Sequence, residues 1–153
     1  MQLDYSRPPD KNSLATIRII WAALLIGEIA FLLVILLFLW PAQRLGPPPA
    51  QSRPSSMLLY DIAWADLAIS VLVGFFVRMM IFQKNRDEQG MIRRGAYVTG
   101  TIIFLAMLEG SGYLGLVNLM LSHALWPHIL PPAIAMAIQV ASFPMGMQVA
   151  DSP

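Results

Sequence analysis

The chain has 153 residues, of which 57% are hydrophobic and only 12% are charged, and its mean hydropathy is +0.62. A soluble domain of this size carries about 25% charged residues, so this chain has too little polar surface to cover a water-soluble globule. The net charge of +1 provides no broad basic field, and we expect no nucleic-acid partner. With no cysteine, the chain forms no disulfide, thiolate metal site or cysteine nucleophile.

The apolar residues form blocks long enough for transmembrane helices, because a hydrocarbon layer of about 30 Å takes roughly 20 helical residues. The first block is longer than a signal-peptide core and is expected to remain as an uncleaved helix. In the last block, Pro131 and Pro132 are tolerated in a first helical turn, and Pro144 is expected to kink or end the helix. The predicted organisation is a cytoplasmic tail (1–16), a first transmembrane helix (17–40), an external proline-rich loop (41–56), a second helix (57–82), a charged cytoplasmic loop (83–95), a third helix (96–121), an external turn (122–128), a fourth helix (129–147) and a cytoplasmic tail (148–153).

The distribution of Lys and Arg predicts the orientation of these helices. Eight of these residues lie in or next to the N-terminal tail and the central loop, whereas the first external loop has two, Arg44 and Arg53. Cytoplasmic loops collect Lys and Arg, so both termini and the central loop are placed in the cytoplasm. The predicted fold class is therefore an all-α integral membrane protein of the cell inner membrane. Its four transmembrane helices form two hairpins, and the lipid bilayer is its solvent.

Two glutamates, Glu28 and Glu109, lie near the middle of the first and third predicted helices. An ionised carboxylate at that depth costs at least a few kcal/mol, so such residues are paired, face protein or water, or hold a proton. Both helices run in the same direction, which places the two carboxyls at similar depth. Two interpretations stay open. Each glutamate is either a protonated side chain hydrogen-bonded to a neighbouring helix or a site that binds and releases an ion.

The third predicted helix has two different polar faces. Tyr113 follows Glu109 by four residues, which predicts a hydrogen bond between the hydroxyl and the carboxyl. A stripe of small and weakly polar residues lies on nearly the opposite side, and such residues let helices approach closely. This predicted packing stripe consists of Ser111, Gly115, Asn118 and Ser122.

The second predicted helix carries a stripe of residues four apart, Asp66, Ser70, Gly74 and Arg78. Asp66 and Arg78 are about 18 Å apart along the helix axis, too far for a salt bridge. We expect Arg78 to reach the cytoplasmic head groups and Ser70 and Gly74 to pack against a helix. Asp66 is expected in a polar contact between helices or in a cavity wall, with Gln139 as a possible partner. It is a further candidate ion-binding residue.

Histidine, aspartate and methionine give no recognisable metal motif. His123 and His128 border the external turn, where only Asp61 and Asp66 could complete a ligand set. The ten methionines lack ligand spacing and are expected to fill packed or lipid-facing positions. We therefore expect no metal or other cofactor and no conventional enzyme site.

The stretch LEGSGYLGLV around Glu109 resembles the carboxylate helix of the proteolipid (c) subunits of rotary ATP synthases. Gly115, Leu116 and Val117 follow the acid by six to eight residues, as in that family, and the helix follows a charged cytoplasmic loop. The resemblance implies that Glu109 binds an ion. The chain departs from the family in its second helix, which has only Gly74, and in its loop, which lacks the Arg-Gln-Pro signature.

The sequence leaves three functions open. The first is a non-enzymatic accessory or structural subunit of a membrane complex, a homo-oligomer or an assembly with partner membrane subunits, with Ser111, Gly115 and Asn118 as its contact face. The second is proton or cation translocation by Glu109 and Glu28. The third is a membrane-embedded enzyme or metal transporter that uses Asp61, Asp66 and the histidines.

Overall fold

A computed structural model describes residues 12–39, 41, 54–86, 88–122 and 124–145 of the chain. This part is helical, with short turns between the helices. Its elements are α1 (Asn12–Val34), the π-helical turn η1 (Ile35–Leu39) that continues it, α3 (Pro54–Lys84), α4 (Arg94–Ser122) and α5 (Leu130–Ala141).

Three of the helices are long and apolar enough to cross a membrane, which indicates a membrane protein. The spans are Leu14–Leu37, Met57–Lys84 and Arg94–Ser122. The fourth predicted helix, expected over 129–147, is shorter than predicted. Its α5 has 12 residues, about 18 Å at 1.5 Å per residue, which falls short of the hydrocarbon thickness. The helix stops at Ala141 because Pro144 disfavours a helical conformation at the residue before it.

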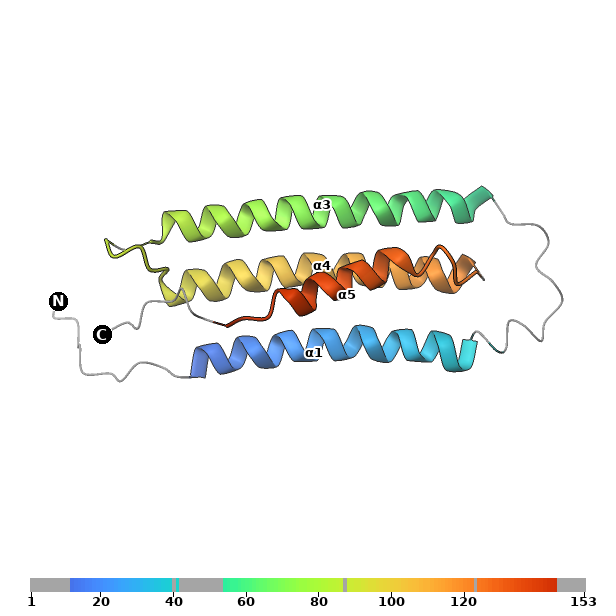
Figure 1. The fold of residues 1–153 in the computed structure, drawn as a ribbon, viewed down its shortest axis with the longest axis horizontal. Coiled ribbons are helices and arrows are strands. Elements are labelled where there is room, and N and C mark those ends of the chain that lie inside the picture. Colours follow the sequence, from blue (N-terminus) through green and yellow to red (C-terminus); the bar gives the residue numbers. More distant parts are fainter. Residues whose placement is uncertain (1–11, 40, 42–53, 87, 123, 146–153) are drawn as a thin grey trace.

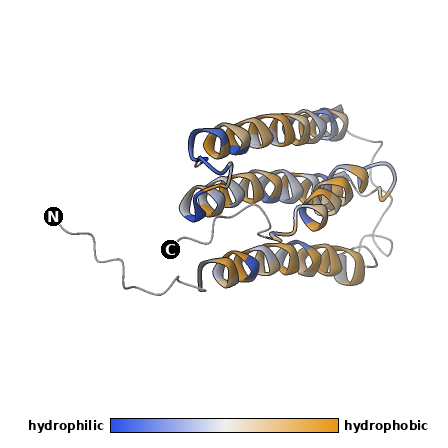
Figure 2. Ribbon diagram, turned by 60° about the vertical axis from the view of Figure 1, so that its left-hand side comes forward, coloured by the Kyte–Doolittle hydropathy of each residue, from blue (hydrophilic) through white to orange (hydrophobic). Residues whose placement is uncertain are grey.

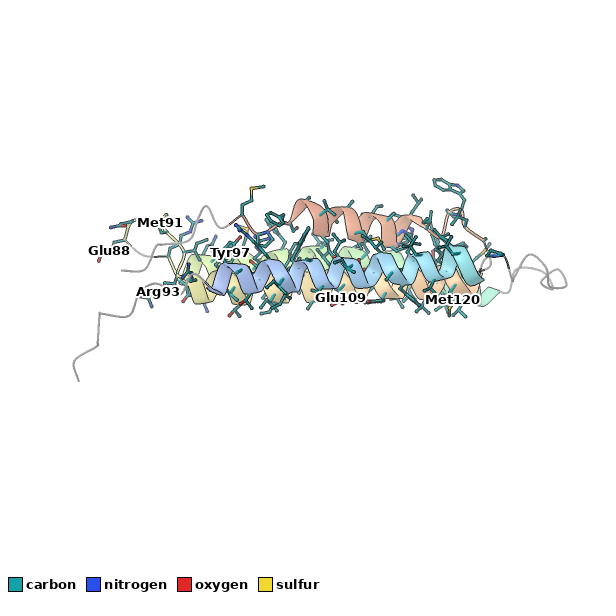
Figure 3. All side chains as sticks on the ribbon, turned by 90° about the horizontal axis from the view of Figure 1, so that it is seen from below. Glu88, Met91, Arg93, Tyr97, Glu109 and Met120 are labelled. Atoms are coloured by element: carbon teal, nitrogen blue, oxygen red, sulfur yellow. The ribbon has the colours of Figure 1, made fainter. Side chains whose placement is uncertain are left out.

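The long helices lie side by side with α4 between α1 and α3, as Figure 1 shows. Helix α4 packs against α1, α3 and α5. Helices α1 and α4 run in one direction and α3 and α5 in the other, and α5 covers one side of α4 (Figures 1 and 3). The first two long helices therefore lie on opposite sides of α4 (Figure 1).

The outward sides of the helices are apolar (Figure 2). Large aliphatic and aromatic side chains are exposed there, among them Ile19 at 68%, Leu72 at 71% and Phe76 at 63%. In lipid these side chains need no cover, because the hydrocarbon is as apolar as they are. The buried side chains instead concentrate on α4, the central helix.

The charged connection between α3 and α4 is a compact turn, shorter than the predicted loop because both helices extend into it. Asn85 accepts a backbone hydrogen bond from the Arg93 N–H at 3.0 Å, and its side chain donates to the Ile81 carbonyl at 2.8 Å. Gly90 has a φ of 79°, a conformation that favours glycine. The predicted proline-rich connector falls largely on 42–53 and the predicted tails largely on 1–11 and 146–153, all outside the described residues.

Candidate functional site

Glu28 lies at the junction of α1, α4 and α5, and its side chain is 0% exposed. Its carboxyl rests on the backbone of Gly112 in α4. A Cβ atom at position 112 would come within 2.8 Å of Glu28 Cδ. Glycine at this position therefore allows the carboxyl to reach the centre of the bundle.

Gln139 of α5 is the hydrogen-bond partner of Glu28. Its Nε2 donates to Glu28 Oε1 at 3.0 Å, and the Gln139 side chain is 1% exposed. The expectation that Gln139 could pair with Asp66 is wrong, because its amide is held by Glu28. Asp66 is half-buried on α3.

This contact leaves two buried oxygen atoms without a hydrogen-bond partner. Within the described part of the chain, Glu28 Oε2 and Gln139 Oε1 have no donor. Unpaired buried acceptors are costly and rare in native proteins. Of the two oxygen atoms of Glu28, one therefore accepts a hydrogen bond from Gln139 and the other accepts none from the described residues.

The end of α5 is fastened to the first turns of α1. The Trp21 indole N–H donates to the Gln139 carbonyl at 2.8 Å, and its ring meets Phe143 edge-on with centroids 4.9 Å apart. The Arg18 Nε donates to the Pro144 carbonyl at 3.3 Å, and the guanidinium lies 5.7 Å from the Phe143 ring centroid. These contacts place the Gln139 side chain opposite Glu28.

Glu109 lies on the side of α4 that is turned away from α5 (Figure 3). It is half-buried, and its carboxyl is close enough to Glu28 and Tyr113 to interact with both electrostatically. The predicted hydrogen bond from Tyr113 to Glu109 is not found among the described residues. The Tyr113 hydroxyl instead lies over Gly27 of α1, 2.9 Å from where a Cβ would stand, and its ring packs against Phe31. Because Gly27 has no Cβ atom, the Tyr113 side chain can pack closely against α1 at this point.

The residues of the predicted packing stripe are covered within the chain. Ser111 is 2% exposed and Asn118 1% exposed, and Gly115 lies against Pro132 of α5, whose Cδ would be 2.7 Å from an added Cβ. Three residues of a face expected to meet a partner subunit are thus buried within this chain, with Gly115 against α5 and Asn118 against His128. On α3, Ser70 is 5% exposed, and Gly74 lies against the ring of Phe104.

Arg78 lies near the end of α3 that leads into the α3–α4 turn. It is half-buried, and its guanidinium lies 5.1 Å from the Phe82 ring centroid and 5.6 Å from that of Phe104. Attraction between the cation and these ring faces stabilises this position of the guanidinium.

His128 belongs to a small polar cluster at the turn between α4 and α5. The Asn118 Nδ2 donates to His128 Nδ1 at 3.2 Å when the imidazole carries its proton on Nε2. The Tyr60 ring meets the imidazole edge-on, with centroids 5.1 Å apart. Burial lowers the pKa of His128 below its usual 6.5. His123 lies outside the described residues, and no group of three His, Asp or Glu side chains converges within the described ones.

Sequence reasoning identified Glu28 but missed Gly112, Gly27 and Trp21, which shape its surroundings. The sequence did contain an indication that Gln139 is the partner of Glu28. Gln139 is the only polar side chain in Leu130–Ala141, and Glu28 is the only acid in Asn12–Val34. Two lone polar groups in apolar helices are expected to find each other. The sequence did not indicate the roles of Gly112 and Gly27, because the side chain that packs against a glycine comes from another helix, whose position the sequence does not give.

Comparison with protein-family models, curated proteins and solved structures finds no match to this chain.

Proposed function

We propose that the protein is a non-enzymatic accessory or structural subunit of a membrane complex. A single observation carries the proposal, which is that Glu109 lies half-buried in the middle of a membrane-crossing helix, on the side that α5 does not cover. A carboxyl at that depth is costly in lipid and is stabilised by a polar or protonated contact with another helix. A helix of a second copy or of a partner subunit would provide that contact.

The residues next to Glu109 on α4 support this assignment. Gly95, Thr99, Ala106, Gly110 and Leu121 are exposed at helical spacing, and we call this set the outer face of α4. A Cβ added at Gly110 meets no described atom within 4 Å. Ala106 and Gly110 are four residues apart, a spacing of small residues that allows another helix to approach closely.

The orientation belongs to the same proposal. The chain lies in the inner membrane with both termini and the α3–α4 turn in the cytoplasm, because eight of its ten Lys and Arg residues cluster at that end. The short α5 begins at the opposite end of the bundle and ends part of the way along α4 (Figure 1).

Site-specific crosslinking in native membranes tests the subunit proposal. The chain has no cysteine, so single cysteines can be introduced at Ala106 on the outer face and, as a control, at Leu72, which is exposed on α3. We expect A106C to crosslink to a neighbouring chain and L72C not to do so. The proposal fails if A106C forms no crosslinked species, or if both positions crosslink equally.

Glu109→Gln provides the second arm of this test. Because the amide keeps the size of the carboxyl but changes its hydrogen bonding, we expect E109Q to reduce co-purification of the neighbouring chain in mild detergent. Gly115→Leu does not serve this purpose. Gly115 lies against Pro132, so the variant would displace α5 within the chain.

Proton or cation translocation is a second candidate function. It is favoured by the presence of two carboxyls, Glu28 on α1 and Glu109 on α4, near the middle of two helices that pack against each other. The resemblance of LEGSGYLGLV to the carboxylate helix of ATP synthase proteolipids supports it as well. In this function Glu109 would bind and release the ion, with Glu28 as a second carboxyl.

A hydrophobic carbodiimide tests this second function, because it modifies protonated carboxyls in lipid. Translocation predicts slow modification of Glu109 and loss of ion uptake into vesicles containing E109Q. Absence of labelling at Glu109, with ion uptake unchanged in E109Q, removes the hypothesis and leaves the crosslinking result unaffected.

A further inference from the structure

The geometry points to a buried proton site: Glu28 carries a proton on Oε2 and donates it to Gln139 Oε1, closing a carboxylic acid–amide pair with two hydrogen bonds. The inference is independent of the subunit proposal, and it gives Glu28 a different role from that of the second carboxyl in ion translocation. It concerns the two atoms that the single Gln139–Glu28 bond leaves unpaired.

The hydrogen-bond inventory of the two groups gives the first argument. A carboxylate has only acceptors, whereas a protonated carboxyl has one O–H donor and keeps its acceptor capacity. The Gln139 Nε2 already donates to Glu28 Oε1 at 3.0 Å. Glu28 Oε2 and Gln139 Oε1, both acceptors, are without a partner among the described residues. One proton satisfies both atoms, since an acid and a primary amide are complementary along their whole edges.

Charge gives the second argument. An ionised Glu28 would be a fully buried anion, and a buried charge is tolerated only with a counter-ion or several donors. Within residues 12–39, 54–86, 88–122 and 124–145, no Lys, Arg or His forms an ion pair with it. Arg18, the nearest basic residue along α1, donates to the Pro144 carbonyl and lies ten residues away, about 15 Å along the axis.

The other groups around Glu28 also favour the neutral form. From α4 the titratable groups facing it are Glu109 and Tyr113, and neither supplies a positive charge. Helix α5 contributes Gln139 and has no titratable side chain between Leu130 and Ala141. Gly112 admits the carboxyl without offering a side-chain donor.

The Glu28–Gln139 pair lies between α1 and α5, and this position indicates a structural role. It joins α1 to α5 across 111 residues of sequence. The carbonyl of the same Gln139 accepts from the Trp21 N–H, and Phe143, which contacts the Trp21 ring, follows one turn later. Helix α5 is too short to be held as an independent membrane-crossing element. The proton on Glu28 is therefore a structural one, which fastens α5 to α1 and is sealed from both membrane surfaces.

Infrared spectroscopy of the full chain in lipid nanodiscs tests the inference. The carbonyl band of a hydrogen-bonded, protonated carboxylic acid should be present in the wild type at neutral pH. We expect Glu28→Gln to remove one such band and Glu109→Gln, the matched control, to leave that band in place. The swapped variant E28Q/Q139E, which restores an acid opposite an amide, should regain it.

Thermal unfolding provides an independent readout. An amide at position 28 forms two hydrogen bonds with Gln139 without any proton, so E28Q should melt close to the wild type. Glu28→Ala leaves the Gln139 amide unpaired and should melt several degrees lower. The inference is overturned if E28Q leaves the acid band unchanged, if E28Q is destabilised as much as E28A, or if E28Q does not fold.

Discussion

Gly112 and Gly110 are two residues apart on α4 but have opposite surroundings. An added Cβ at Gly112 would meet the Glu28 carboxyl carbon at 2.8 Å, whereas one at Gly110 meets nothing within 4 Å. At some helix positions glycine is required because a facing side chain occupies the space of a Cβ atom, as at Gly112. At others, such as Gly110, it only lowers the helix propensity, and the two cases differ in what the facing element places there.

This contrast predicts opposite effects of the same substitution. Gly112→Ala should lower the free energy of unfolding by about 1–3 kcal/mol, because the methyl group displaces the Glu28 carboxyl from its contact with Gln139. Gly110→Ala should be neutral or stabilising by up to about 1 kcal/mol, the helix-propensity difference. Unfolding in detergent, followed by circular dichroism, measures both. Equal losses in the two variants would contradict the packing described for Gly112.

His128 predicts a pH dependence of stability. Burial lowers its pKa in the folded protein below the usual 6.5, so the unfolded chain binds more protons in the window below about pH 6.5. Stability should be complete above that value and decrease as the pH falls through the window. Protonation would also place a donor at Nδ1 opposite the Asn118 amide N–H.

Melting curves between about pH 7.5 and about pH 5 check this prediction. The wild type should lose melting temperature toward the acidic end, and His128→Gln should flatten the profile. His123→Gln, the control at the other histidine, should keep the wild-type slope. A slope that persists in H128Q would assign the titration to another group.

At the scale of elements, α5 is a short helix held by side chains from α1 and by the surface of α4. Its prolines lie in the first turn, where backbone N–H groups need no partner inside the helix. Its other end is fixed by Trp21, Arg18 and Phe143. A helix of this length is marginal alone, so its order depends on these contacts.

Trp21→Phe isolates one of them. The variant keeps an aromatic ring near Phe143 and removes the indole N–H that donates to the Gln139 carbonyl. A lost hydrogen bond of about 1 kcal/mol should speed amide hydrogen exchange in α5 by roughly fivefold. Exchange in α3 should not change. Trp64→Phe, at a tryptophan of α3 that meets Tyr60 edge-on, is the control and should leave α5 exchange as in the wild type.

The described helices together form one layer of three helices that are long and apolar enough to cross a membrane, with α5 on one side of it (Figure 1). The outward surface is apolar along the helices and charged at the α3–α4 turn (Figure 2). A bilayer crossed by all three helices would place the two ends of the layer in different aqueous compartments. The absence of native cysteine makes this directly measurable.

Single cysteines at Glu88 and Trp126 should react with a membrane-impermeant maleimide from opposite sides. Both side chains are exposed, the first in the α3–α4 turn and the second before α5. The excess of Lys and Arg at the first end predicts that E88C is labelled only from the cytoplasmic side. If both cysteines were labelled from the same side, α4, which lies between them in the sequence, would not cross the membrane, and the proposed orientation would be contradicted.

The pattern of residues along the chain predicted the helices, three of which are long enough to cross a membrane, and the acids near their middles. Helical hydrogen bonds are local. Whether a helix can span a lipid bilayer depends mainly on its length and on the polarity of its side chains. Three features needed the folded structure: α4 separates α1 from α3 (Figure 1), Gly115 lies against Pro132 of α5, and Gln139 pairs with Glu28 rather than Asp66. The choice of partner across 111 residues depends on which surfaces fit together, and above all on whether a glycine such as Gly112 leaves room for the facing side chain.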